Sequence, residues 1–271
     1  MRDFEKFQPV IKWTGSKRSQ AFAIIKEIPS FNTYFEPFLG GGSMMYAIAP
    51  QKGVCGDICS PLIDLWILIQ KDYIKVYYEY GLRWNELQKN GHSYYYEIRN
   101  RFNKTKCPYD FLFLTRTCVN GLIRFNKKGE FNSSFHHTRN GINPERLKTI
   151  LEKWSNKIQN VEFVNKNYYE TTVEAKKDDF IYLDPPYFNT SGVYFGNIDF
   201  DNFINYLIDL NNRNIKWGLS YDGIRGENDF IANVPKEIYK RHLMIPSGLS
   251  GFNKVLNNKL EQVHESLYLN Y

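Results

Sequence analysis

The stretch that decides the fold is residues 34–57, YFEPFLGGGSMMYAIAPQKGVCGD. Its apolar start, residues 34–38, predicts a buried strand, and the three glycines that follow predict a tight turn. Residues 43–49 predict a helix and residues 54–57 a second short strand. Residues 60–70, which begin with a capping Ser and a Pro, predict another helix. This order is typical of a doubly wound, Rossmann-like α/β sheet.

The alternation of strands and helices stops near residue 70 and resumes near residue 158. In between, helical patterns precede a Lys-Lys-Gly turn, whose flanks (residues 122–125 and 130–131) predict a β-hairpin. We therefore expect a discontinuous α/β domain, 1–69 and 158–271, with a mainly helical insertion at 70–157. The later elements that we expect are strands at 161–164, 180–183 and 215–220, a helix at 200–211, and an antiparallel pair at 238–245 and 264–271.

Positive charge is concentrated in the insertion. The chain has 271 residues and a net charge of +6, but residues 70–157 alone hold 17 Lys or Arg against 8 Asp or Glu. The remainder is slightly acidic, so the insertion carries all the excess. Such a block suits a polyanion such as nucleic acid, and an ordinary solvated basic surface explains it equally well.

The composition excludes several classes of protein. No apolar run reaches the about 18 to 20 residues of a membrane span, and the first six residues lack the apolar core of a signal peptide. The four cysteines include no Cys-x-x-Cys, so we expect no metal site. A reduced, cytoplasmic protein without membrane contact is the prediction.

The strongest chemical signal is Asp184-Pro185-Pro186-Tyr187, directly after the predicted strand 180–183. Ligands bind at the carboxyl ends of strands in open α/β sheets. The prolines remove two N–H donors and leave carbonyl oxygens without local partners. Such a turn can hold a planar ring that bears an amino group, which would stack on Tyr187 and donate to Asp184 and the Pro185 carbonyl. The alternative is a Pro-rich loop with a capping Asp.

The glycine turn, Phe38-Leu39-Gly40-Gly41-Gly42, predicts a second part of the same site. Its glycines allow backbone to approach a ligand closely, but Met45 stands where a dinucleotide motif needs its third glycine. Asp57, at the end of the next strand, can bind ribose hydroxyls or instead cap a helix. A nucleoside without phosphate fits this pattern, and S-adenosylmethionine is such a molecule.

A third element is the segment KWTGSKR at residues 12–18. Lys17 could reach a carboxylate such as a methionyl tail, and Trp13 could pack over it. Taken alone, this segment favours an ordinary surface lysine.

Together these motifs, in this order, resemble the adenine-N6 DNA methyltransferases of the Dam type, the α group. The resemblance covers essentially the whole chain and implies an inserted target-recognition domain at 70–157, double-stranded DNA as substrate and no metal. It implies that S-adenosylmethionine contacts Trp13, Lys17, Phe38, Gly40, Gly42, Asp57 and Asp184. The flipped target adenine would be held by Asp184, Pro185, Pro186 and Tyr187.

The middle of the chain also resembles the recognition hairpin of that family. The matching residues that we expect at DNA are Arg116, Asn120, Arg124 and Asn126. Arg124 is the candidate for a base-edge or backbone contact, and Lys127 and Lys128, at the hairpin tip, for phosphate contacts.

The chain departs from the family pattern at several positions. Ser16 replaces a glycine before the motif lysine, and Val119 stands where several members carry an aromatic residue. Asn167 replaces an aspartate after the third strand, so any pairing with the cofactor adenine would be uncharged. The resemblance also makes a cognate restriction endonuclease plausible, although nothing in this chain shows one.

Several other activities are alternatives to adenine-N6 transfer. A cytosine-C5 enzyme is excluded because it needs a cysteine nucleophile, usually after proline, and no Pro-Cys exists here. Cytosine-N4 and RNA methyltransferases can use a similar turn, more often with Ser or Asn in place of Asp184. From another class, a sequence-specific DNA-binding protein with an inactive methyltransferase fold remains the alternative.

Overall fold

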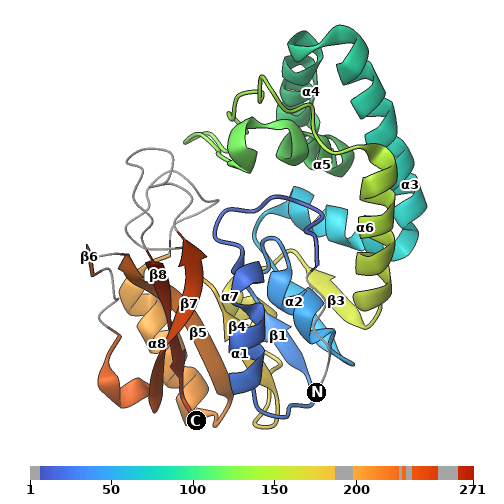
Figure 1. Ribbon diagram of the computed structural model, residues 1–271. Coiled ribbons are helices and arrows are strands. Elements are labelled where there is room, and N and C mark those ends of the chain that lie inside the picture. Colours follow the sequence, from blue (N-terminus) through green and yellow to red (C-terminus); the bar gives the residue numbers. More distant parts are fainter. Residues whose placement is uncertain (1–6, 187–197, 226–227, 230–233, 250–261) are drawn as a thin grey trace.

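The computed structural model describes residues 7–186, 198–225, 228–229, 234–249 and 262–271. One sheet carries helices on both faces, and a group of helices extends beyond one end of it (Figure 1). The helices are α1 (Ala21–Glu27), α2 (Ser43–Ile48), α3 (Ser60–Asn90), α4 (His92–Thr105), α5 (Pro108–Thr117), α6 (Pro144–Lys157), α7 (Tyr168–Thr172) and α8 (Phe200–Asn212), with short 3₁₀ turns at Lys17–Ser19, Val119–Gly121 and Lys236–Ile238.

The sheet has the order β3-β2-β1-β4-β5-β8-β7, with β6 paired to β5 off this path. The first five strands are parallel, and β8 and β7 are antiparallel at the edge. This confirms the predicted mixed α/β sheet and its C-terminal antiparallel pair. The strands are β1 (Tyr34–Glu36), β2 (Gly53–Gly56), β3 (Val161–Val164), β4 (Phe180–Leu183), β5 (Lys216–Arg225), β6 (Asn228–Asp229), β7 (Arg241–Leu249) and β8 (Gln262–Leu269).

The central strands are buried on both faces, as parallel strands covered by helices must be. Tyr34 and Phe180 belong to the apolar cluster that includes α1, α2, α3 and α6. Their chain neighbours Phe35 and Ile181 belong to a second cluster, formed with α8. The alternation of side chains along a strand therefore divides the core into two layers, one on each side of the sheet.

Helix α3 joins the sheet to the outlying helices. It begins at Ser60, as predicted, but Cys59 is its N-cap, and it continues through a kink at Asp72 (φ −155°, ψ 76°) to Asn90. The Gln70 amide, just before the kink, donates to the carbonyls of Ile158 and Val161. The two chain segments that connect the sheet with the outlying helices are thus bonded to each other.

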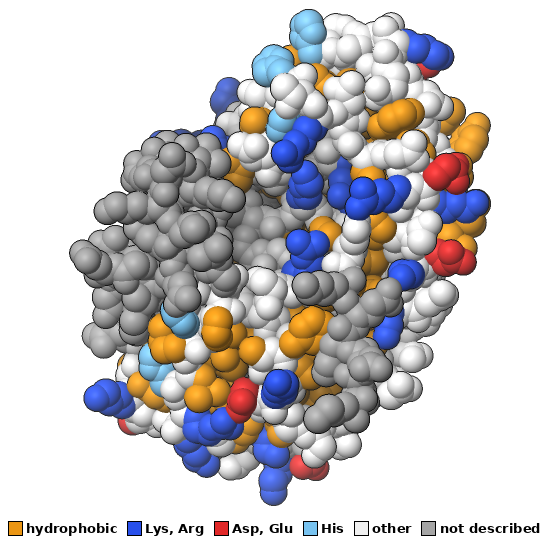
Figure 2. Space-filling view, in the orientation of Figure 1, with side chains coloured by type: hydrophobic (Ala, Val, Ile, Leu, Met, Phe, Trp, Pro, Cys, Tyr) orange, Lys and Arg blue, Asp and Glu red, His pale blue; other side chains and the backbone are white. Residues whose placement is uncertain are grey.

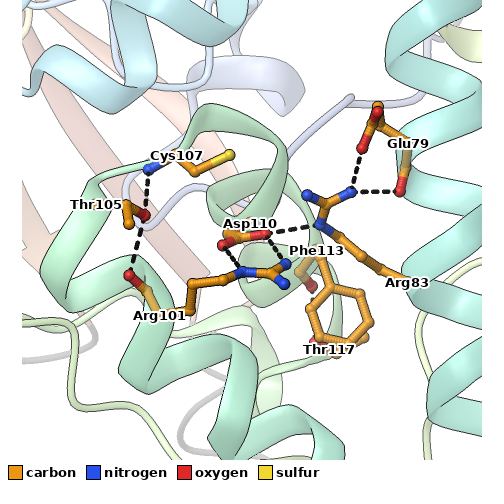
Figure 3. Close-up of polar contacts among 8 residues, drawn as sticks. All are labelled: Glu79, Arg83, Arg101, Thr105, Cys107, Asp110, Phe113 and Thr117. Atoms are coloured by element: carbon orange, nitrogen blue, oxygen red, sulfur yellow. Dashed lines mark hydrogen bonds and ion pairs between the residues drawn. The ribbon is translucent and has the colours of Figure 1, made fainter.

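A buried ion cluster holds the outlying helices together (Figure 3). Asp110 of α5 is completely buried and accepts from Arg83 Nε at 2.7 Å and from Arg101 Nε and Nη2 at 2.8 and 2.7 Å. Arg83 of α3 also donates to the Glu79 carboxylate. One carboxylate therefore connects α3, α4 and α5.

The hairpin predicted at 122–131 does not form a regular ladder. The structure has isolated antiparallel bridges instead, between Phe125 and Phe131 and between Cys118 and Phe135. Two backbone bonds of a hairpin do form, from the Asn126 N–H to the Glu130 carbonyl and from the Asn132 N–H to the Arg124 carbonyl. The reciprocal bonds are lost to side chains, because the Arg124 N–H goes to Ser133 Oγ and the Glu130 N–H to Asn126 Oδ1.

Candidate active site

The candidate site lies where the strand order of the sheet reverses. β1 pairs with β2 on one side and with β4 on the other, so the carboxyl ends of β1 and β4 flank a crevice. A cavity of about 220 Å³ opens there. It is lined by residues of the N-terminal motif, the glycine turn, Asp57, Asn167 and the turn after β4. The predicted cofactor-binding residues Trp13, Lys17, Phe38, Gly40, Gly42, Asp57, Asn167 and Asp184 all line it.

The glycine turn forms one wall of the cavity, and its first two glycines leave no room for a side chain. A Cβ on Gly40 would lie 2.6 Å from Trp13 Nε1, and one on Gly41 would lie 2.9 Å from Trp13 Cβ. Gly40 also has φ +46°, in the left-handed region. The indole of Trp13 therefore packs directly on the backbone of the turn.

Asp57 holds this turn in place. Its carboxylate accepts from the Gly40 N–H and the Cys59 N–H, each at 3.0 Å. Burial raises the pKa of Asp57, although these backbone bonds oppose the shift. The carboxylate thus bonds the backbone just before α3 rather than capping its first turn, and it also lines the cavity.

Asn167 has a structural partner as well. It caps α7, accepting from the Glu170 N–H at 2.9 Å in a reciprocal capping box. Its carbonyl oxygen is engaged in this way, so its amide N–H groups are the part suited to pair with a ligand in the cavity.

Lys17 and Asp184 form the polar centre of the site. Lys17 Nζ lies 2.7 Å from Asp184 Oδ1, and the Lys17 side chain is 3% exposed. The interpretation of Lys17 as a surface lysine is therefore wrong, because packing of the N-terminal segment against the sheet encloses it. Burial raises the pKa of Asp184 to about 6, while Lys17 opposes this shift and the nearby Glu265 carboxylate adds to it.

The rest of the turn after β4 is only partly described. Pro185 is buried and Pro186 half-buried, and both line the cavity. Tyr187, the predicted stacking residue, lies outside the described residues.

Two acidic residues of the site were missed in the sequence. Glu36, the last residue of β1, lines the cavity and accepts from the Tyr34 hydroxyl at 2.8 Å. Burial raises the pKa of Glu36 to about 8, and the Asp184 charge adds to the shift. Glu265 of β8 lies 3.4 Å from Lys17 Nζ. A charged residue within an apolar strand was the available signal for Glu36.

The predicted DNA-contacting residues fall into two groups. Asn120, Arg124, Lys127 and Lys128 are exposed. Figure 2 shows Lys and Arg side chains around a hollow between the sheet and the outlying helices. These four residues remain available for a polyanion.

The other two predicted contacts, Arg116 and Asn126, are engaged within the protein. Arg116 is 8% exposed and donates to the Pro9 carbonyl. Burial lowers the pKa of Arg116 to about 10. Asn126 forms the turn itself, since its Oδ1 accepts from the N–H groups of Lys128 and Glu130. These contacts weigh against both residues as direct readers of DNA.

The described residues contain neither a metal-binding group nor a membrane-spanning helix. Among them, no group of three or more His, Cys, Asp or Glu side chains is arranged to hold a metal ion. No helix in the same part of the chain has both the length and the apolar character needed to cross a membrane.

Comparisons with known proteins agree with this geometry. Residues 13–247 match the family described as D12 class N6 adenine-specific DNA methyltransferase. A DNA adenine methylase of Vibrio cholerae is 32% identical over 187 residues, which are 68% of this chain and 66% of that protein. The type II methyltransferase M1.LlaDCHI of Lactococcus lactis is 30% identical, over 66% of each chain. The type II methyltransferase M.MjaIII of Methanocaldococcus jannaschii is 28% identical, over 66% of this chain and 69% of its own. The match thus spans about two thirds of each relative.

Proposed function

The chain belongs to the D12 class N6 adenine-specific DNA methyltransferases, and from this premise we propose that it transfers a methyl group from S-adenosylmethionine to N6 of a flipped adenine in duplex DNA. One observation carries the proposal. The cavity at the reversal of strand order brings the glycine turn and the Asp184-Pro185-Pro186 turn to one place, although they are more than 140 residues apart in sequence.

The walls of this cavity suit the methyl donor. Gly40 and Gly41 have no side chains, so the turn and the Trp13 indole that packs on it form one wall of the cavity. Thr14 Oγ1 is buried in the lining without a hydrogen-bond partner among the described residues. Phe38 and Tyr168 stack at 5.6 Å and give the cavity a flat apolar wall. S-adenosylmethionine, when bound, supplies an electrophilic methyl group on a positively charged sulfur.

Asp184 and Pro185 act on the target amino group. The lone pair of the adenine nitrogen is delocalised into the ring, which makes it a poor nucleophile. The Asp184 carboxylate and the Pro185 carbonyl would accept its two hydrogens and favour a tetrahedral nitrogen. Positive charge develops on that nitrogen during transfer, so these acceptors stabilise the transition state more than the ground state. Holding the reactants in line can contribute about 7 to 11 kcal/mol.

The insertion, residues 70–157, would bind the target duplex. Its exposed Arg124, Lys127 and Lys128 lie in the segment that follows α5. They would supply phosphate or base-edge contacts, while extrusion of the adenine costs a few kcal/mol that stacking in the site offsets. A cognate restriction endonuclease and a cytoplasmic location stay predictions from the sequence.

The direct test is transfer of labelled methyl groups to duplex DNA, followed by digestion to nucleosides. Labelled N6-methyladenine supports the proposal. Labelled N4-methylcytosine or transfer to RNA alone would replace it with another methyltransferase activity. DNA binding without any transfer would identify a binding protein on an inactive fold.

The fall of kcat/KM on the acid side of its pH profile, the acid limb, provides a second test. Asp184 must be ionised both to accept a hydrogen bond from the adenine amino group and to stabilise its developing positive charge. Burial raises the pKa of the Asp184 carboxyl to about 6. We therefore expect kcat/KM, which reports the free enzyme, to fall as the pH drops through about 6 and to level off above it. A limb near the ordinary Asp value of about 3.9 would show that burial does not raise the pKa of Asp184 in the free enzyme.

Replacing Arg124 with alanine is expected to weaken binding of the target duplex. The loss should be about 1 to 3 kcal/mol if the guanidinium reads a base, with relaxed selectivity between sequences. The matched control is Lys216→Ala, which removes an exposed positive charge at the amino end of β5. The cavity lies at the opposite, carboxyl ends of the parallel strands. Equal affinity of the Arg124 variant and the control for target and non-target duplexes would exclude a contact by Arg124.

A further inference from the structure

Three charged side chains from distant parts of the chain meet beside the cavity. Lys17 comes from the N-terminal motif, Asp184 from the end of β4, and Glu265 from the antiparallel strand β8. Lys17 Nζ lies 2.7 Å from Asp184 Oδ1, 3.4 Å from Glu265 Oε2, and 3.0 Å from the Gly15 carbonyl to which it donates. The side chains are 3%, 21% and 16% exposed, respectively. The lysine is therefore shared by two carboxylates in a place largely closed to water.

The contact of Glu265 with Lys17 is ionic rather than a hydrogen bond. Glu265 Oε2 is buried and has no hydrogen-bond partner among the described residues. Its other oxygen accepts from the Ser247 hydroxyl on the neighbouring strand β7 at 3.2 Å. A buried carboxylate oxygen without a donor is costly. Its attraction to the lysine charge is what offsets that cost here.

The charge balance around Asp184 follows from the described groups that face it. Glu36 of β1 approaches from one side, and burial raises the pKa of Glu36 to about 8, so it is mainly neutral near pH 7. Tyr182 of β4 donates or accepts at the Ser220 hydroxyl and is held neutral, because burial raises its pKa well above the ordinary value. Among the residues that the structure describes, two carboxylates, on Asp184 and Glu265, then face one ammonium group, which leaves one net negative charge.

We propose that Glu265 is a positioning residue, whose carboxylate neutralises Lys17 so that the charge of Asp184 stays available to the reacting amino group. This rests on the proposed methyl transfer. Without Glu265, Asp184 would be the one carboxylate of the described residues beside Lys17, and the lysine would neutralise more of the Asp184 charge. The developing positive charge on the adenine nitrogen would then meet a neutral pair rather than an anion.

The experiment compares the wild-type protein with Glu265→Gln, Glu265→Asp and a matched control, Glu162→Gln. Glu162 is an exposed glutamate on β3, at the other end of the sheet. We expect Glu265→Gln to lower kcat about tenfold, as for other residues that hold a functional group in place, with little change in KM for DNA. Glu265→Asp should restore most of kcat, and Glu162→Gln should match the wild type.

A second readout does not depend on activity. The Asp184 carboxyl can be titrated by ¹³C NMR in the ligand-free protein, with the Asp184→Asn spectrum to assign its signal. Loss of the neighbouring anion should lower the pKa of Asp184 in Glu265→Gln, because the Glu265 charge raises it. The acid limb of kcat/KM should move to lower pH by the same amount.

The outcomes separate this inference from the proposed function. An unchanged Asp184 titration and an unchanged kcat in Glu265→Gln would overturn the role of Glu265 while the wild type still methylates DNA. Equal losses of kcat in Glu265→Gln and Glu265→Asp, with an unchanged titration, would also overturn it. A wild type that makes no N6-methyladenine would instead refute the proposed function, and the NMR titration would still decide whether Glu265 tunes Asp184.

Discussion

Replacing Asp184 with alanine is expected to abolish methyl transfer and to leave the protein folded. Asp184 lies at the carboxyl end of β4, where it lines the cavity beside Pro185. Removing it deletes a charged acceptor at the position where positive charge develops. Loss of one such preorganised group costs about 10²- to 10³-fold in kcat. The fold should survive because Lys17 keeps the Gly15 carbonyl and Glu265 as partners.

The measurement is labelled methyl transfer at saturating cofactor and duplex, with thermal unfolding recorded on the same samples. Asp184→Asn keeps the shape of the side chain and should lose most of the activity too, because it lacks the charge. The control is Asp178→Ala, an exposed aspartate just before β4. Near-normal turnover of Asp184→Ala would remove Asp184 from the mechanism.

Replacing Asp110 with alanine is expected to lower the free energy of unfolding strongly, because Asp110 holds three of the outlying helices together. Asp110 is fully buried and accepts from Arg83 and Arg101, which belong to two other helices (Figure 3). Without it, Arg83 remains buried with Glu79 as its remaining acidic partner. Breaking a buried pair by removing one member costs about 3 kcal/mol or more, because the other charge stays in a poorly solvated place.

Equilibrium unfolding in urea measures this loss as a change in the free energy of unfolding. The control is Glu86→Ala, which breaks the exposed ion pair of Glu86 with Lys89 on α3. It should leave the unfolding curve unchanged, since exposed pairs contribute little. The prediction about Asp110 fails if both variants unfold at the same urea concentration as the wild type.

The sheet was largely predictable because its signals are local. β3 and β4 have the bounds predicted from their short apolar runs, and α8 differs from its prediction by one residue. The end of the first helix was also predicted closely. Asp72, two residues after Gln70, has non-helical φ/ψ, so α3 is two helical stretches that meet at a kink. That the second stretch follows the kink directly, packed against α6, is a tertiary feature that sequence periodicity does not report.

The polar residues were predicted less well than the apolar ones. Arg116 was expected at DNA and Lys17, taken alone, at the surface, and both are buried. Composition cannot distinguish an exposed cation from one buried with a carbonyl or carboxylate partner, because the partner is distant in sequence. Arg116 meets Pro9, and Lys17 meets Asp184.

By itself, the sequence determined the helices, the strands and the motifs that carry the chemistry. Each of these signals, such as an apolar strand run or the Asp-Pro-Pro turn, depends only on residues that are close together in the chain. Only the tertiary structure decided which charges face one another. It placed Glu36 and Glu265 beside Asp184, and it gave Lys17 two carboxylates to share. The physical reason is that burial and Coulomb attraction depend on distance in space, which strand pairing sets across the sheet and residue spacing along the chain does not.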